Sequence, residues 1–236
     1  MMRGKNRQDC LPPVPPSPNA LSALIQDVSG RYAAASRYTQ GYVRSKLRWD
    51  PATAAILELA AKQPFGHVVD LGCGRGQLAL ALLVSCGAQR VTGLDSDAPR
   101  LREARHAAKG LPARFDLTDL TVASIPEGNT ILLVDVLYQL PLRAQFRLLE
   151  SAAAAARQRL VIRTFDPHLG WRSRVGYAAE VVNRALRRDQ GASIQPMPLP
   201  QLSARLAAQG FQVTVHPCWA GTPLPNVLVV AERTGA

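Results

Sequence analysis

The sequence predicts a doubly wound α/β domain whose mostly parallel, seven-stranded sheet ends in a C-terminal antiparallel hairpin. Three observations support this fold class. From residue 67 onward, short apolar segments alternate with segments of helical length. A glycine-rich turn joins the first of these strands to its helix, and the last two strands are separated by only a short turn. Such alternation is typical of right-handed βαβ units packed into a parallel sheet.

Before the alternating region, the chain divides into a tail and a helical segment. Residues 1–18 contain five prolines, and we expect them to form a disordered tail. An apolar helical face begins near Asn19, so residues 19–50 are predicted to form an N-terminal helical cap. Asp50 followed by Pro51 is typical of an N-cap and first helical residue, so the main domain is expected to span residues 51–236.

Within the main domain, the elements follow from the hydrophobic pattern. We expect strands over residues 67–72, 90–95, 113–117, 129–137 and 159–165. We expect helices over residues 77–88, 98–110 and 141–157. After a helical insertion at about residues 168–192, a helix over 199–210 precedes strands over 211–219 and 225–233. Pro217 suits an edge strand, because proline cannot donate to a neighbouring strand.

The composition excludes several classes of protein. No run of residues reaches the ~20 apolar positions that a membrane-spanning helix needs. The basic N-terminus lacks the apolar centre of a secretory signal, so we expect a cytoplasmic protein. The four cysteines and four histidines are scattered, which predicts unpaired thiols and no metal site.

The charge is strongly positive, with 28 Lys and Arg against 17 Asp and Glu. Such a surface suits anionic partners: nucleic acid, an acidic membrane face, or a substrate that carries phosphate or carboxylate. An arginine-rich composition alone gives the same excess, so both interpretations stay open.

The most informative segment is the turn after the strand at 67–72. Asp70 precedes Gly72, Gly74 and Gly76, and this GxGxG spacing differs from the GxGxxG of dinucleotide-binding proteins. A carboxylate at the strand end repels a pyrophosphate but attracts an ammonium group. The turn therefore predicts a ligand with an amino-acid moiety. Asp95, 21 residues beyond Gly74, ends the next strand, where an acid can bind both hydroxyls of a ribose.

The DLGCGRGQ turn followed by TGLDSD resembles the first two motifs of class I S-adenosylmethionine-dependent methyltransferases. The resemblance covers roughly residues 51–233 and implies S-adenosylmethionine as cofactor. It places the methionine part near Asp70 and Gly72, allows close packing at Gly74, and places the ribose on Asp95. The remaining cofactor-binding candidates are Cys73, Ser96, Asp119, Leu120 and Asp135. Asp119 is preferred over Asp116 as the acid near the adenine amino group.

The segment DVLYQLP at residues 135–141 resembles the DVLxxLP segment of methyltransferases that act on small molecules and lipids. The signature of enzymes that methylate base amines, (Asp/Asn)-Pro-Pro-(Tyr/Phe), is missing, which disfavours nucleic-acid base amines as acceptors but not every RNA substrate. Tyr138 and His168 are the candidate catalytic residues: Tyr138 as an orienting group or proton acceptor, and His168 as a general base. The non-catalytic alternatives are that Tyr138 is a packed aromatic ring and that His168 is a solvated loop histidine.

Two segments beside the predicted site allow more than one interpretation. The apolar stripe and arginines of residues 171–188 fit a lid over an apolar substrate with an anionic end, a membrane-surface contact, or an ordinary amphipathic helix. Tyr42, Arg44 or Lys46 could reach the cofactor or substrate, or belong to a plain surface helix. No transmembrane segment is expected in either case.

Three functions follow as hypotheses. The first is methyl transfer to a small-molecule or lipid-like acceptor. The second is an RNA- or protein-directed methyltransferase, supported only by the charge. The third is a non-catalytic, cofactor-binding partner subunit.

Overall fold

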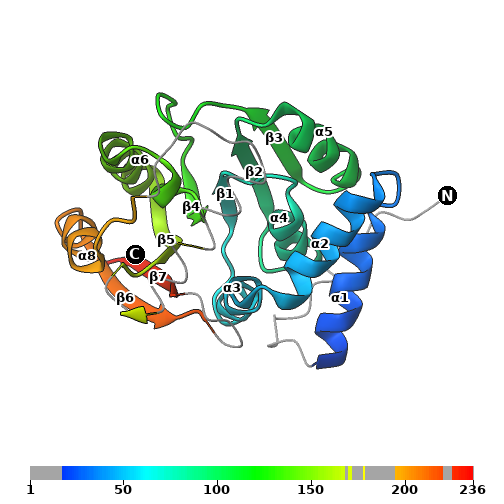
Figure 1. Cartoon of the computed structure of the whole chain (residues 1–236), viewed down its shortest axis with the longest axis horizontal. Coiled ribbons are helices and arrows are strands. Elements are labelled where there is room, and N and C mark those ends of the chain that lie inside the picture. The colour runs from blue at the N-terminus through cyan, green and yellow to red at the C-terminus, as the bar shows by residue number, and fades with distance from the viewer. Residues whose placement is uncertain (1–17, 168–169, 172–177, 179–194, 220–224, 236) are drawn as a thin grey trace.

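The computed structural model describes residues 18–167, 170–171, 178, 195–219 and 225–235. A central seven-stranded sheet has the strand order β3-β2-β1-β4-β5-β7-β6, and helices cover both of its faces (Figure 1). This architecture confirms the predicted doubly wound fold.

The strands are β1 His67–Leu71, β2 Arg90–Asp95, β3 Ala113–Leu117, β4 Gly128–Val134, β5 Ala156–Phe165, β6 Phe211–Pro217 and β7 Asn226–Arg233. The helices are α1 Pro18–Gly30, α2 Arg37–Trp49, α3 Pro51–Lys62, α4 Gln77–Val84, α5 Ala98–Ala107, α6 Leu142–Ala155 and α8 Leu199–Ala207, with a 3₁₀ helix η1 at Leu137–Gln139.

Strand direction places the ends of the first strands on one edge of the sheet. β1 pairs in parallel with β2 and β4, so Asp70 lies beside Gly93 on one side and Leu132 on the other. β7 runs antiparallel between β5 and β6, which gives the predicted hairpin. Pro217 ends the edge strand β6, as expected.

Two apolar clusters sandwich the sheet. Val68 and Leu132 belong to the cluster that includes α1 to α5, whereas Val69 and Leu133 belong to the cluster that includes α6 and α8. Because successive strand residues point to opposite faces, a strand that is buried on both sides has a continuous run of apolar residues in its sequence. This explains why the sequence shows no polar alternation in these segments.

The N-terminal helices pack against the face of the sheet that carries α4 (Figure 1). Val43 and Leu47 of α2 are buried there. The Tyr32 hydroxyl donates a 2.6 Å hydrogen bond to the carbonyl of Arg75. Asp50 caps α3 by accepting from the backbone N–H of Ala52, which confirms the predicted N-cap.

Some element boundaries differ from those expected. The strand expected over residues 129–137 ends at Val134, because Asp135 adopts a positive φ of 60° that breaks extended backbone. The helix expected to reach residue 157 ends at Ala155, and β5 begins directly at Ala156. His168, most of the insertion and residues 1–17 lie outside the described residues.

The expectation of unpaired thiols is wrong for Cys86, which is disulfide-bonded, whereas Cys73 and Cys218 are free and buried. A helix with the length and apolarity needed to cross a bilayer does not occur in the described ranges. Within the same ranges, His, Cys, Asp and Glu side chains do not cluster in a way that could hold a metal ion.

Candidate functional site

The glycine-rich turn after β1 is fixed to β2 by backbone hydrogen bonds. The N–H groups of Gly72 and Cys73 both donate to the carbonyl of Leu94, at 2.7 and 3.1 Å. Gly72, Gly74 and Gly76 have φ values of 76°, 55° and 75°, a region that favours glycine. The GxGxG spacing therefore reflects three left-handed positions in a single turn.

Two of these glycines differ in what surrounds them. A Cβ at Gly72 would lie 2.4 Å from the Cγ2 atom of Val136, so the turn and the segment after β4 are in direct contact. A Cβ at Gly74 would meet nothing within 4 Å. The turn is thus closed toward β4 at Gly72 and open at Gly74, where a ligand can approach the backbone.

Asp95 holds the turn together from the end of β2. Its carboxylate accepts a 2.7 Å hydrogen bond from the N–H of Gly74 and a 2.8 Å bond from the N–H of Asp97. The side chain is buried, whereas the neighbouring Ser96 is exposed. The structure therefore brings together Gly74 and Asp95, which the sequence places 21 positions apart.

Asp70 is the buried acid beneath the turn. Burial first, and then the nearby Asp95 carboxylate, raise the pKa of Asp70 to about 7. Among the described residues, none donates a hydrogen bond to this carboxylate or pairs with it as a cation. A buried acid without a cation is stabilised by a positively charged ligand, so its position suits an ammonium group.

Cys73 takes part in the turn through its backbone N–H group, and its thiol is not a reactive thiolate. Its side chain is buried and free, and burial, aided by Asp70 and Asp95, raises the pKa of its thiol. A thiol held in its neutral form is a weak nucleophile.

The predicted adenine-side residues follow β3. Asp119 is exposed, and its carboxylate accepts hydrogen bonds from the N–H and the hydroxyl of Thr121, which lower its pKa. The competing Asp116 lies within β3 and pairs with Arg114 at 2.7 Å. Asp119 and the half-buried Leu120 therefore occupy the loop after the strand, and their role stays a prediction.

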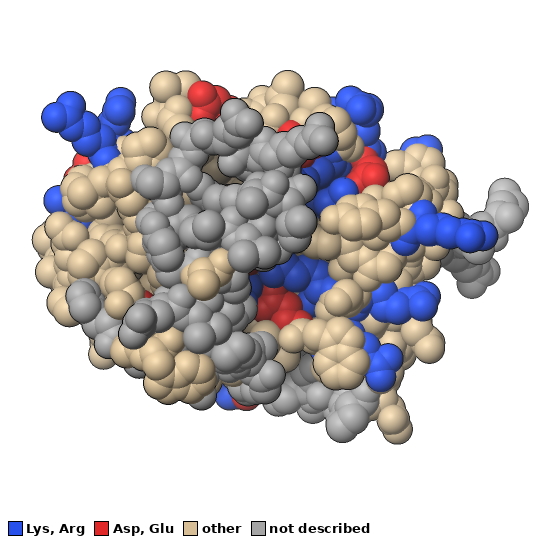
Figure 2. All heavy atoms as spheres, viewed as in Figure 1, with Lys and Arg blue, Asp and Glu red and all other residues tan. Residues whose placement is uncertain are grey.

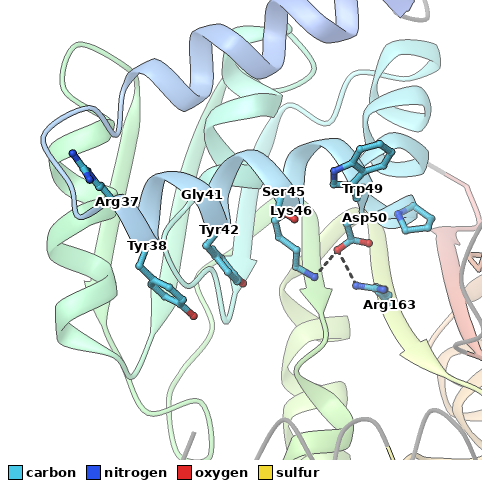
Figure 3. A pocket seen from close by; sticks show the side chains of 10 residues that line it. Arg37, Tyr38, Gly41, Tyr42, Ser45, Lys46, Trp49, Asp50 and Arg163 are labelled. Atoms are coloured by element: carbon cyan, nitrogen blue, oxygen red, sulfur yellow. Dashed lines mark hydrogen bonds and ion pairs between the residues drawn. The ribbon is translucent and has the colours of Figure 1, made fainter. Parts of the chain in front are cut away.

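A cluster of four charged side chains lies beyond the end of β4. Asp135 accepts from Nη1 of Arg163 at 2.6 Å and lies 3.4 Å from Nζ of Lys46. Asp50 pairs with the same two cations, at 3.0 Å from Arg163 and 2.5 Å from Lys46 (Figure 3). Asp135 thus connects the end of β4 to α2 and β5 through this charge quartet.

Mutual pairing shifts the pKa values of Lys46, Arg163 and Asp50 toward their ionised forms. Burial alone would lower the pKa values of Lys46 and Arg163, but Asp135 and Asp50 raise both. Burial alone would raise the pKa of Asp50, but the two cations lower it. The sequence predicts that Lys46 could reach the site but does not predict its pairing with Asp50, whose only expected role is the cap of α3. The signal that could have found the quartet is an arginine at the end of the apolar strand β5.

Tyr138, one of the candidate catalytic residues, is buried in η1. Its ring meets that of Phe165 edge to face, with centroids 5.0 Å apart. This packing supports the structural interpretation of Tyr138 and leaves its catalytic role a prediction. The other candidate, His168, lies outside the described residues.

A cavity of about 590 Å³ runs along α2 toward this quartet (Figure 3). We call it the α2 groove. Its lining on α2 includes Tyr38, Gly41, Tyr42, Ser45, Lys46 and Trp49. Asp50 and Arg163 also line it, so the groove and the charge quartet share residues. The volume is in the range of small-molecule sites.

Arg75 of the glycine-rich turn fixes the position of α2. Its guanidinium lies 5.0 Å from the ring centre of Tyr42 and pairs with Glu103 at 2.7 Å. Glu103 also accepts a 2.8 Å hydrogen bond from the hydroxyl of Thr39 in α2. The helix that lines the groove is therefore attached directly to the turn.

Residues 68–159 match the model of a family described as a methyltransferase domain. Ribosomal protein L11 methyltransferases of Burkholderia mallei and Burkholderia pseudomallei are 37% identical to this chain over 103 residues, which is 43% of this chain. The match spans 33% of the relatives' length, so the chain covers about a third of these curated proteins.

Solved structures show the same fold at low sequence identity. Magnesium protoporphyrin IX methyltransferase from Synechocystis, solved with bound S-adenosylhomocysteine, is 20% identical, with a TM-score of 0.61 over 90% of this chain and 95% of that one. An O-methyltransferase family protein from Burkholderia thailandensis is 19% identical, with a TM-score of 0.66 over 91% of this chain and 64% of that one. Both comparisons place the chain in the fold that the sequence predicts.

Proposed function

We propose that this chain, whose residues 68–159 match the model of a methyltransferase domain, is a class I S-adenosylmethionine-dependent methyltransferase and transfers a methyl group to a small-molecule or lipid-like acceptor. S-adenosylmethionine, the methyl donor of this family, supplies when bound a methyl group already activated by a positively charged sulfur. The protein's own task is then to orient the two reactants and to exclude water.

The residues around the glycine-rich turn fit this cofactor. Asp70, buried and without a cation among the described residues, would hold the ammonium group of the methionine part. Gly74 leaves space for close approach, and Asp95 would exchange its bonds to backbone for bonds to the ribose. Ser96, Asp119 and Leu120 are proposed to contact the adenine. The observation that carries the proposal is this pairing of a buried, unneutralised carboxylate with an open glycine turn.

A small acceptor is favoured by what lies next to the turn. Val136 contacts Gly72, and Asp135, which precedes Val136, belongs to the charge quartet at the α2 groove. Residue contacts through Asp135 and Val136 therefore link this cavity of small-molecule size to the proposed cofactor site. Tyr138 follows in the same segment and is proposed to orient the acceptor.

A protein or RNA acceptor is the second candidate. The curated relatives are named ribosomal protein L11 methyltransferases, and basic side chains gather near α1 and α2 (Figure 2). This candidate predicts salt-sensitive binding to ribosomal components, because released counterions drive such binding. The third candidate, a non-catalytic partner subunit, predicts cofactor binding without any transfer.

Methyl-labelled S-adenosylmethionine and fractionated cell extract separate these candidates. We expect label in the organic-soluble fraction with the unmodified protein and none with Asp95→Ala. Label confined to protein or RNA would replace the first proposal by the second. Measured cofactor binding with no label in any fraction would favour the partner subunit.

A further inference from the structure

The α2 groove is lined by aromatic rings with small residues between them. Gly41 and Ser45, which are small and exposed, lie between the aromatic side chains of Tyr38, Tyr42 and Trp49 along the helix (Figure 3). The rings of Tyr38 and Tyr42 are stacked, with centroids 6.4 Å apart and planes inclined by 25°. Tyr38 and Trp49 are each 70% exposed, so most of the surface of both rings is open to a ligand.

One end of the groove carries an unused hydrogen-bond donor. Arg163 is 5% exposed, and its Nη1 atom bonds to both Asp50 and Asp135. Its Nε atom is buried and has no hydrogen-bond partner among the described residues. A buried donor without a partner costs about 1–3 kcal/mol, so an oxygen atom of a ligand at this position would be stabilised.

The charges of the groove favour an anionic oxygen. Asp50 is the acid that lines the groove among the described residues, and Lys46 and Arg163 neutralise it together with Asp135. The outer end of the groove is formed by Arg37, which adds a further positive charge. Because these carboxylates are engaged by cations, the described residues at this end of the groove supply no strong base, and an acceptor that is already ionised needs none.

We infer that the α2 groove binds the methyl acceptor, and that this acceptor is a flat, largely apolar molecule that carries a carboxylate bound by Arg163. The inference rests on the proposed methyl transfer and names the chemical class of its substrate. The apolar body lies against Tyr42 and Trp49 above Gly41 and Ser45. The carboxylate lies at the end of the groove nearest to Asp135, which is connected through Val136 to the glycine-rich turn.

Two probes of equal shape test this inference without any turnover. Calorimetry would compare 2-naphthoate, a flat carboxylate, with its uncharged analogue 2-naphthamide. We expect the unmodified protein to bind naphthoate at least about tenfold more tightly than naphthamide, because only the carboxylate forms a charge-assisted bond with Arg163. Arg163→Lys retains the charge but lacks Nε, and we expect it to reduce this ratio to about twofold or less.

Two matched tryptophan variants test whether the probes bind in the α2 groove. Ser45→Trp fills the floor of the groove and is expected to weaken the binding of both probes at least about tenfold. Ala54→Trp adds the same ring at an exposed position on α3 outside the groove, and is expected to leave both affinities within about twofold. Circular dichroism and thermal unfolding would check that each variant is folded.

Several results would overturn the inference. These are undetectable naphthoate binding to the unmodified protein, equal affinity for the two probes, or equal effects of Ser45→Trp and Ala54→Trp. S-adenosylhomocysteine affinity is measured in parallel on the same samples. If the unmodified protein does not bind S-adenosylhomocysteine, the proposed function fails, and the probe results still report on the groove itself.

Discussion

The carboxylate of Asp95 accepts a hydrogen bond from the backbone N–H of Gly74 at 2.7 Å. This contact joins the end of β2 to the turn after β1. The same carboxylate also accepts a hydrogen bond from the N–H of Asp97, just beyond β2. The acid proposed to bind the ribose is therefore also the group that orders the turn. Ligand binding and loop geometry depend on the same side chain.

Asp95→Ala is expected to weaken S-adenosylhomocysteine binding about 100-fold or more, because it removes two charge-assisted contacts to the ribose and releases the turn. Calorimetry would measure the affinity, and far-ultraviolet circular dichroism would check that the fold is intact. Unchanged affinity would contradict the ribose assignment of Asp95.

Gly72→Ala is expected to destabilise the protein by about 2–4 kcal/mol, because it adds a side chain at a positive φ and against Val136. Urea denaturation would measure the free energy of unfolding. The double variant Gly72→Ala/Val136→Ala is expected to recover the steric part of this loss. Strictly additive effects of the two substitutions would show that the contact with Val136 is not limiting.

Asp70 predicts a pH-dependent stability. Its ordinary pKa of 3.8 is raised to about 7 in the folded protein, so between about pH 4 and 7 the folded state keeps a proton that the unfolded chain has lost. The free energy of unfolding that Asp70 contributes therefore falls as the pH rises through this window. Asp70→Asn, which cannot ionise, is expected to gain stability relative to the unmodified protein from about pH 5 to about pH 8. Parallel stability profiles in urea denaturation at these pH values would contradict the raised pKa.

Asp70→Asn is expected to weaken ligand binding although it stabilises the fold. At about pH 8 Asp70 is ionised and attracts the ammonium group, so Asp70→Asn should weaken S-adenosylhomocysteine binding about tenfold. Calorimetry on the two proteins at the same pH would measure this. If Asp70→Asn is more stable but binds S-adenosylhomocysteine as tightly as the unmodified protein, Asp70 does not belong to the cofactor site.

Asp119 and Asp116 can be distinguished by a matched pair of substitutions. Asp119→Asn is expected to weaken S-adenosylhomocysteine binding several-fold, whereas Asp116→Asn, which disrupts a surface pair with Arg114, should change it little. Adenosine competition would show whether the loss concerns the adenine part. The reverse ranking would assign the adenine contact to Asp116.

The fold and the glycine turn could be predicted because their signals are local. The burial of both sheet faces produces apolar runs, and the three left-handed positions of the turn require glycine within five residues. Asp50 followed by Pro51 likewise predicts the start of α3 from two adjacent residues.

The charge quartet could not be predicted in the same way. Asp50 and Arg163 are 113 positions apart, and Arg163 and Asp135 are 28 apart, so their pairing depends on how α2 packs against the sheet. The end of β4 was also placed too late, because an aspartate with positive φ has no local signature in an apolar run. The disulfide of Cys86 was missed, since scattered cysteines carry no spacing signal.

We propose that the carboxylate of Asp70 at the glycine-rich turn selects an amino-acid ligand over a diphosphate. Calorimetric titration of the full chain with S-adenosylhomocysteine and, separately, with a nicotinamide dinucleotide tests it most directly. We predict saturable binding of S-adenosylhomocysteine and none of the dinucleotide. Uptake of the dinucleotide without binding of S-adenosylhomocysteine or S-adenosylmethionine would contradict the account.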